Sequence, residues 1–112
     1  MEIYHNPRCS KSRQTLEIIQ ESGVDFTIRK YLEDPPTKEE LRKILSILDI
    51  SPQTLIRKNE PLFKNEYKNR DLTDEEWLDV LVENPKLIQR PIVIDRDRAV
   101  IGRPPENVRE LL

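Results

Sequence analysis

One stretch near the start of the chain limits the possible folds most, because it joins a strand-like segment to a helix and contains the only cysteine. Residues 2–5 are typical of a short strand, which Asn6 and Pro7 end. Apolar residues then recur at helical spacing over about residues 10–22, before a glycine that favours a helix end. We therefore expect Cys9 at or just before a helix N-terminus.

The expected position of Cys9 favours the thiolate form of its side chain. Unpaired backbone N–H groups and the positive end of the helix dipole lower the pKa of a thiol there, and they also bind oxyanions. The chain lacks the second cysteine of a redox dithiol, because Ser12 occupies that position. Thr15 stands where a phosphatase-type loop would have an arginine. The sequence therefore predicts a monothiol site with a hydroxyl group nearby.

A buried structural role is the alternative for Cys9, since a lone cysteine is more often a small buried hydrophobic residue. Its neighbours favour an accessible thiol, because basic and polar side chains fit poorly in a core. These neighbours are Arg8, Ser10, Lys11, Ser12 and Arg13.

Length and charge exclude several classes of protein. The 112 residues fit one domain, and 19 Lys and Arg against 21 Asp and Glu give a net charge of −2, which offers no general attraction to nucleic acid or to an anionic membrane. A single cysteine excludes an internal disulfide, and the start of the chain lacks the features of a secretory signal. No apolar stretch approaches the ~20 residues that span a bilayer. We expect a cytoplasmic monomer.

Strand patterns follow the cysteine segment and recur near the end of the chain. Residues 26–31 alternate apolar and polar side chains, which predicts a second strand parallel to the first in a βαβ unit. Residues 92–94 and 99–101 flank a polar turn, which predicts an antiparallel hairpin. Pro104 then opens a last helix. The expected order is β-α-β, a helical segment, and β-β-α.

The middle of the chain is expected to be mainly helical. Capping boxes at residues 37–40 and 73–76 predict two amphipathic helices. Residues 63–70 have no clear period, so we expect an exposed and mobile connection there. The sequence thus predicts one α/β domain over residues 1–112, with a helical insertion over about residues 37–86.

This order of elements resembles the thioredoxin and glutaredoxin fold, with its mixed sheet. In that fold a cysteine follows the first strand, and a cis proline beside the active thiol precedes the third. Pro91 is the candidate for this proline. The alternative is a trans proline at a strand start, which is far commoner.

Nearly the whole chain resembles the glutaredoxin-like arsenate reductase family. The motif His-Asn-Pro-x-Cys-x-x-Ser-Arg at residues 5–13 is similar to the active-site loop of that family. The resemblance implies the reduction of arsenate with glutathione as co-substrate and glutaredoxin as partner, without a bound cofactor. Further similar segments lie at residues 31–36, 55–59, 88–93 and 103–104.

The resemblance also assigns roles to particular side chains. It places Cys9 as the nucleophile that attacks arsenic, and Arg57, Arg90 and Arg103 as the oxyanion-binding arginines. Guanidinium groups suit this task, because they bind tetrahedral oxyanions through paired hydrogen bonds. Without a second cysteine, an external thiol must resolve the cysteine–arsenic adduct, and the resemblance implies glutathione followed by glutaredoxin.

The remaining loop residues each have two interpretations. His5 lowers the thiol pKa, or it is a structural histidine at a strand end. Ser12 donates a hydrogen bond to the thiolate, or it caps the helix. Asn6 orients the loop through its amide, or it only shapes the turn.

Two other functions are compatible with the same fold. One is a general glutathione-dependent thiol oxidoreductase, in which the arginines bind glutathione carboxylates. The other is a redox-responsive regulator that binds RNA polymerase, which Ser12 argues against, because such proteins generally carry a C-x-x-C switch. Metal binding is not expected, because one Cys and one His do not complete an ordinary site.

Overall fold

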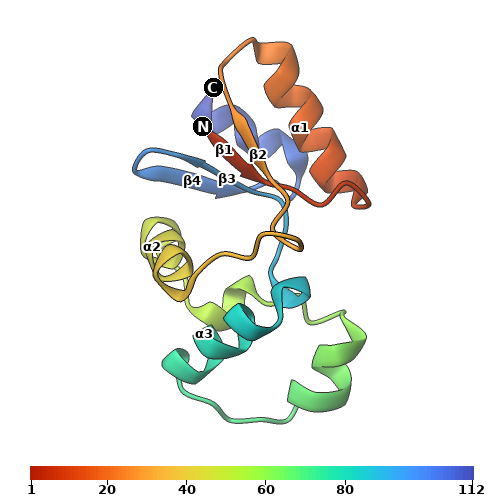
Figure 1. Cartoon of the computed structure of the whole chain (residues 1–112), viewed down its shortest axis with the longest axis vertical. Coiled ribbons are helices and arrows are strands. Elements are labelled where there is room, and N and C mark those ends of the chain that lie inside the picture. Colours follow the sequence, from red (N-terminus) through yellow and green to blue (C-terminus); the bar gives the residue numbers. More distant parts are fainter. The chain divides into compact units, whose positions relative to one another are not determined.

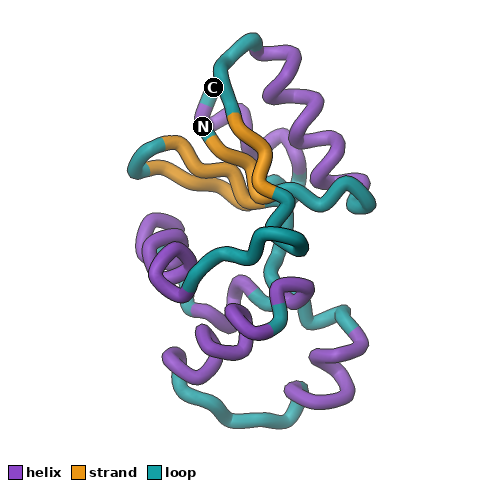
Figure 2. Tube along the Cα trace, viewed as in Figure 1, coloured by secondary structure: helices purple, strands orange, loops and turns teal.

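The computed structural model describes residues 1–112, which form two compact units (Figures 1 and 2). The first unit consists of Met1–Asp34 and Arg90–Leu112, and the second consists of Pro35–Gln89. All four strands belong to the first unit, whereas the second is built from helices and loops (Figure 2). The helical insertion predicted over residues 37–86 lies within the second unit.

The first unit contains a four-stranded mixed sheet with the strand order β2-β1-β3-β4 (Figure 1). β1 pairs in parallel with β2 and antiparallel with β3, while β3 and β4 form the predicted antiparallel hairpin. The strands are β1 (Glu2–Tyr4), β2 (Thr27–Arg29), β3 (Ile92–Asp95) and β4 (Arg98–Ile101). β2 is shorter than predicted, because the carbonyl of Lys30 accepts hydrogen bonds from Glu33 and Asp34 and so starts a turn.

Two helices complete the first unit. α1 (Ser10–Ser22) has the predicted bounds and ends at Gly23, whose φ of 79° is left-handed and suits a residue without a side chain. η4 (Pro105–Leu111) is a 3₁₀-helix that packs against α1 and β4. The core of the unit is a cluster of buried apolar residues from both sequence segments: Ile3, Ile19, Val93, Val108 and Leu111.

The second unit contains α2 (Lys38–Leu48) and α3 (Asp74–Glu83), which pack against each other. Both begin with the predicted capping boxes. Three shorter helices complete the unit: η1 (Pro52–Leu55), η2 (Phe63–Tyr67) and η3 (Pro85–Leu87).

The segment of residues 63–70 is mostly exposed, as expected of a connection, but part of it is helical. Phe63–Tyr67 forms a π-helix, and its first residue is buried. A π-helix does not have the i, i+4 period of an α-helix. This one is stabilised by the contact of Phe63 with Trp77, whose ring centroids lie 6.2 Å apart. The local sequence therefore contained no periodic signal of the helix.

No helix in the chain has the length and apolar character needed to cross a membrane.

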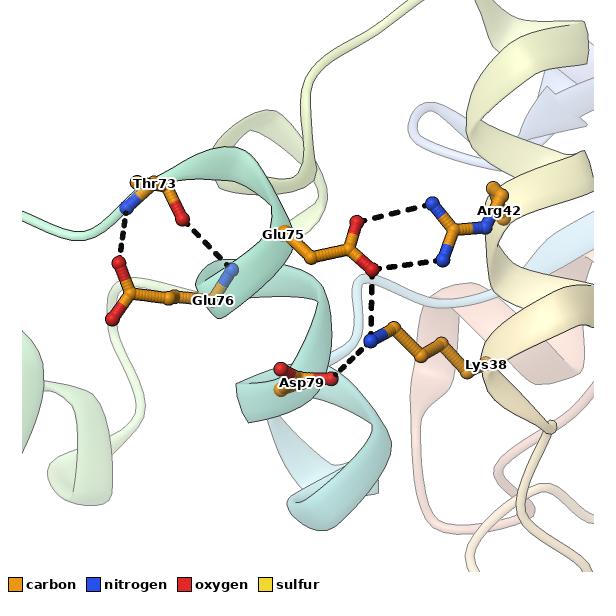
Figure 3. A network of polar contacts seen from close by, with 6 residues as sticks. All are labelled: Lys38, Arg42, Thr73, Glu75, Glu76 and Asp79. Carbon is orange, nitrogen blue, oxygen red and sulfur yellow. Dashed lines mark hydrogen bonds and ion pairs between the residues drawn. The ribbon is translucent and has the colours of Figure 1, made fainter.

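An exposed network of charges joins α2 and α3 (Figure 3). The two guanidinium nitrogens of Arg42 donate to the Glu75 carboxylate at 3.0 and 2.8 Å. Lys38 Nζ lies 2.8 Å from Glu75 and 2.7 Å from Asp79. Arg42, followed by Lys38, lowers the pKa of Glu75 to about 2.

Candidate active site

The loop between β1 and α1 is shaped by its own backbone and by one amide side chain. The carbonyl of Asn6 accepts a hydrogen bond from the backbone N–H of Cys9 at 3.0 Å. Oδ1 of Asn6 accepts from the N–H of Arg8, also at 3.0 Å. Cys9 is the N-cap residue of α1, with extended backbone angles. Asn6 therefore shapes the turn that leads Cys9 into the helix.

Ser12 ties the loop to the end of β1. Its hydroxyl lies 2.6 Å from Nδ1 of His5 and accepts a hydrogen bond from the backbone N–H of Asn6 at 3.0 Å. All three residues are buried. Buried polar groups need such partners, because they have lost their hydrogen bonds to water. The Ser12 hydroxyl thus fixes the first turn of α1 against the strand.

His5 is neutral near neutral pH. Burial lowers its pKa, and the positive charges of Lys30 and Arg13 lower it further. A neutral imidazole supplies no positive charge to the thiolate, so His5 acts on the loop through the hydroxyl of Ser12. The proposed catalytic roles of His5 and Ser12 stay predictions.

The expectation of an accessible thiol needs correction, because Cys9 is only 8% exposed. Arg8, Ser10 and Lys11 are exposed as their polarity suggested, but the helix start turns Cys9 and Ser12 inward. The surroundings of the sulfur are nevertheless polar.

Two arginines of the first unit act on the Cys9 sulfur. Nη2 of Arg103 lies 3.6 Å from Sγ, within the range of a hydrogen bond to sulfur. Nε of the same guanidinium donates to the carbonyl oxygen of Arg90 at 2.8 Å, which orients the Arg103 side chain.

The net effect of these surroundings is a lowered pKa of the Cys9 thiol. Burial is the largest single influence and raises the pKa. It is outweighed by a hydrogen bond and the positive charge of the Arg90 guanidinium, together with the backbone N–H groups of Ser12 and Lys11. The site therefore favours a thiolate at a helix N-terminus, as the sequence predicted.

Close packing of the chain brings Arg103 to the sulfur. The Arg90–Pro91 peptide bond is cis, as the resemblance implied, and the N–H of Gly102 donates to the carbonyl of Pro91 at 2.9 Å. A Cβ atom at Gly102 would lie 2.5 Å from Oγ1 of Thr15 and 2.7 Å from Cγ of Pro91. Only glycine fits this contact between α1 and the segment that carries Arg103.

The close packing of Gly102 against Thr15 beside the site was not predicted from the sequence. Their contact joins distant parts of the chain, and the only local signal was a glycine directly before a candidate arginine. A second cis bond, between Arg103 and Pro104, was also not predicted.

Arg57 lies in the second unit. Its Nη1 donates to Oε2 of Glu60 at 2.8 Å, and its backbone N–H donates to the carbonyl of Leu87 at 2.7 Å. The contribution of Arg57 to oxyanion binding stays a prediction.

The structure contains no group of three or more His, Cys, Asp or Glu side chains that could hold a metal ion.

A sequence model of a known family matches residues 4–111, which is nearly the whole chain. The chain belongs to the ArsC family. Among its relatives, the protein named YfgD of Escherichia coli K12, which is described as uncharacterized, is 45% identical and aligns over 100% of this chain and 96% of its own length. An arsenate reductase of the same strain is 44% identical over 98% of this chain and 79% of its own length.

A solved ArsC-type structure confirms the predicted fold class. The arsenate reductase from Vibrio cholerae superposes with a TM-score of 0.93 at 40% identity, covering 100% of this chain and 98% of that one. The mixed α/β architecture is therefore the thioredoxin-like fold of ArsC proteins, and the resemblance seen in the active-site loop extends over the whole chain.

Proposed function

We propose that this ArsC-family protein reduces arsenate to arsenite, with Cys9 as the nucleophile. The observation that carries the proposal is a cysteine with a lowered pKa at a helix N-terminus, 3.6 Å from the Arg103 guanidinium. A thiolate and a fixed positive charge at one place suit a reaction that joins sulfur to an oxyanion. Relatives 44% and 40% identical to this chain are named arsenate reductases.

In the first step the Cys9 thiolate attacks arsenic. A sulfur–arsenic bond forms, and an arsenic–oxygen bond breaks with release of hydroxide, which is protonated to water. Arg90 and Arg103 stabilise the negative charge on the remaining oxygens, since planar guanidinium groups bind oxyanions through paired hydrogen bonds. Arg57 is proposed to add a third guanidinium to the bound substrate.

Two external thiols then supply the two electrons that reduce arsenic from As(V) to As(III). The sum is one arsenate and two thiols giving one arsenite, one disulfide and one water. Because Cys9 is the only cysteine, neither thiol comes from this chain. We propose glutathione as the first thiol and glutaredoxin as the second, in a reducing cytoplasm that keeps both thiols available.

His5, Asn6 and Ser12 are proposed to act as positioning residues. Their buried hydrogen bonds hold the backbone N–H groups of the first turn of α1 beside the sulfur. These N–H groups favour the thiolate before attack and stabilise an oxyanion at the same place.

The test of the nucleophile is the rate of arsenite formation from arsenate with glutathione and glutaredoxin present. We expect Cys9→Ser to lower the rate by about 10³-fold or more, because a serine hydroxyl is far less ionised than this thiol. Ser10→Ala, at the exposed neighbouring position, is the matched control and should keep near wild-type activity. Substantial arsenite formation by a folded Cys9→Ser variant would refute the assignment.

The thiol donors are tested by omission. Removal of glutathione or of glutaredoxin from the assay should each slow the reaction of the wild-type protein. If thioredoxin with its reductase replaces both without loss of rate, the reduction of arsenate stands but the proposed donors are wrong. Reduction of a glutathione mixed disulfide at a higher rate than arsenate would instead favour a general thiol oxidoreductase.

A further inference from the structure

The three segments that build the candidate site contain cations but no carboxylate. They are residues 3–16, 90–94 and 98–105, and none includes Asp or Glu, although the net charge of the whole chain is −2. Two of their arginines are assigned to the sulfur and the substrate. Three further cations lie in the segment that contains Cys9, and the proposed chemistry uses none of their charges: Arg8, Lys11 and Arg13.

These three cations are not neutralised by the chain. Arg8, Lys11 and Arg13 are exposed, and none of them forms an ion pair with a carboxylate. Nη1 of Arg13 donates instead to the carbonyl oxygen of Pro7 at 3.0 Å, an acceptor without a full charge. The positive charge of Arg13 therefore remains, and it lowers the pKa of His5 within the loop. The surface around the thiol thus presents uncompensated positive charge.

The charges of α1 oppose the helix dipole. Lys11 and Arg13 lie in its first turn, which contains no acidic residue, and its last turn contains Glu21 and no basic residue. The other two α-helices have the ordinary arrangement, with acidic residues in their first turns. Cations at a helix N-terminus weaken the helix, because they face the positive end of its dipole. Helix stability therefore does not explain the cations at the start of α1.

Arg8 and Lys11 are the cations nearest to the thiol in the sequence. Arg8 adjoins Cys9, and Lys11 lies two residues beyond it in α1. Neighbouring Cα atoms are about 3.8 Å apart, so that, with the length of the side chains added, both charges lie within roughly 15 Å of the sulfur. The Debye length is ~8 Å at physiological ionic strength and ~30 Å in dilute buffer. Both charges therefore attract an anion that approaches the thiol, most strongly at low ionic strength.

We propose that Arg8 and Lys11 are specificity-determining residues, which select a thiol donor with carboxylates, such as glutathione, over a neutral thiol. The inference rests on the proposed function, since it concerns the donor that resolves the adduct on Cys9. That donor must bring its own thiol close to this sulfur, where its carboxylates accept charge-assisted hydrogen bonds from the two cations. A neutral thiol gains neither these bonds nor the attraction.

The selection by charge is measured on Cys9 itself, by comparing alkylation by iodoacetate with alkylation by iodoacetamide. Both reagents form a carbon–sulfur bond with loss of iodide and are similar in size, but only iodoacetate is an anion. Since Cys9 is the only cysteine, both rate constants belong to it. Their ratio at one pH reports on charge at the site, because the fraction of thiolate cancels.

Removal of either cation should lower the ratio of the iodoacetate rate constant to the iodoacetamide rate constant. At an ionic strength of about 10 mM we expect a decrease of about twofold for Arg8→Gln, about twofold for Lys11→Gln, and about fourfold for the two together. At about 1 M salt the Debye length is ~3 Å, so the ratios of the variants and of the wild-type protein should converge.

Arg96→Asn is the matched control, because it removes an exposed cation at the other end of the sheet. Arg96 follows β3 at the end where β1 begins, whereas the Cys9 loop follows the opposite end of β1. Asparagine tolerates the left-handed backbone at this position, where φ is 60°. The ratio of the two rate constants should equal that of the wild-type protein.

The thiol donor is tested in the arsenate assay with glutathione and with its diethyl ester, which keeps the thiol but lacks the carboxylate charges. Glutaredoxin is kept in excess, so that the reaction at Cys9 limits the rate. We expect the wild-type protein to use glutathione at least about fourfold more efficiently than the ester, measured as kcat/KM for the thiol. The double variant Arg8→Gln with Lys11→Gln should lose most of this preference.

Two results would overturn the proposal. The first is an unchanged ratio of the alkylation rate constants in the double variant at low ionic strength, and the second is an unchanged preference for glutathione over its ester. Alkylation does not involve arsenate. A protein that gives the expected alkylation ratios but forms no arsenite would therefore refute the proposed function and leave the charge selection at Cys9 intact, so the two failures are distinguishable.

Discussion

The two units use polar side chains in opposite ways. In the first unit, His5, Asn6 and Ser12 are buried and hydrogen-bonded to one another beside Cys9. In the second unit, Lys38, Arg42, Glu75 and Asp79 form ion pairs (Figure 3), and their side chains are between 34% and 53% exposed. Both arrangements shift pKa values, but only the first holds its groups away from water.

This difference determines what each network can contribute. A buried hydrogen bond is costly to lose, because water does not replace the missing partner. An exposed ion pair is screened by water and salt, so its removal costs little even when a pKa is far from its usual range. The large pKa shift of Glu75 is therefore a poor guide to its contribution to stability, whereas the buried groups beside Cys9 hold the loop that carries the thiol.

The strongest test of close packing in the first unit is Gly102→Ala. The added Cβ would collide with Thr15 and Pro91, so we expect the free energy of unfolding to fall by about 1–3 kcal/mol or more. Because Arg103 follows directly, its contact with Cys9 should also weaken. Chemical denaturation measures the first effect, and the rate of thiol alkylation measures the second.

Gly23→Asn is the control for Gly102→Ala. Nothing lies within 4 Å of a Cβ at Gly23, and asparagine tolerates its left-handed backbone, so we expect a change of about 0.5 kcal/mol or less. Thr15→Ala should recover part of the stability lost in Gly102→Ala. Equal stability of the two glycine variants would show that the contact with Thr15 is not tight.

The buried hydroxyl of Ser12 should matter more than an exposed hydroxyl of the second unit. Ser12→Ala leaves the backbone N–H of Asn6 and Nδ1 of His5 without their partner, which should cost about 1–3 kcal/mol in chemical denaturation. Ser46→Ala, at an exposed position in α2, should change stability by about 0.5 kcal/mol or less. Similar values for both serines would contradict the distinction between the units.

His5 should make the protein sensitive to mild acid. Its pKa is lowered on folding, so the unfolded chain binds a proton more readily than the folded one as the pH falls below about 6.5. The stabilising contribution of neutral His5 is present above that pH and is lost as the pH falls through the folded-state pKa. His5→Gln should reduce this loss, measured as unfolding free energy between neutral and mildly acidic pH. If the unfolding free energy of His5→Gln depends on pH as strongly as that of the wild-type protein, groups other than His5 cause the acid sensitivity.

The smallest effect is expected for Glu75→Gln in the second unit. Its partners Lys38 and Arg42 are at the surface, so water replaces the lost ion pairs and the change in stability should lie within the error of chemical denaturation. The lowered pKa stabilises the fold above the ordinary carboxyl pKa, and this contribution is lost as the pH falls towards about 2. If Glu75→Gln lowers the unfolding free energy as much as Ser12→Ala does, the exposed network is as important for stability as the buried one, which contradicts the comparison.

Local signals in the sequence predicted much of the fold. The bounds of α1 followed from helical spacing and a terminal glycine, and the capping boxes of α2 and α3 followed from threonine and glutamate at fixed spacing. These features depend on neighbouring residues only. The helix Phe63–Tyr67 was missed because a contact with the distant Trp77 stabilises it.

The site was predicted less completely for the same reason. A thiol at a helix N-terminus and a cis Pro91 were visible from local sequence and from resemblance. The burial of Cys9 and the contact of Gly102 with Thr15 depend on how distant segments pack, which no local pattern encodes.

The most direct test of the central claim is the pKa of Cys9, measured from the pH dependence of its alkylation by iodoacetamide. Cys9 is the only cysteine, so the wild-type protein gives a single titration. We expect a pKa below that of a free thiol, a higher pKa in Arg90→Gln, and no change in Arg109→Gln, at an exposed arginine of η4. A wild-type pKa equal to that of a free thiol, or an unchanged pKa in Arg90→Gln, would contradict an arginine-stabilised thiolate.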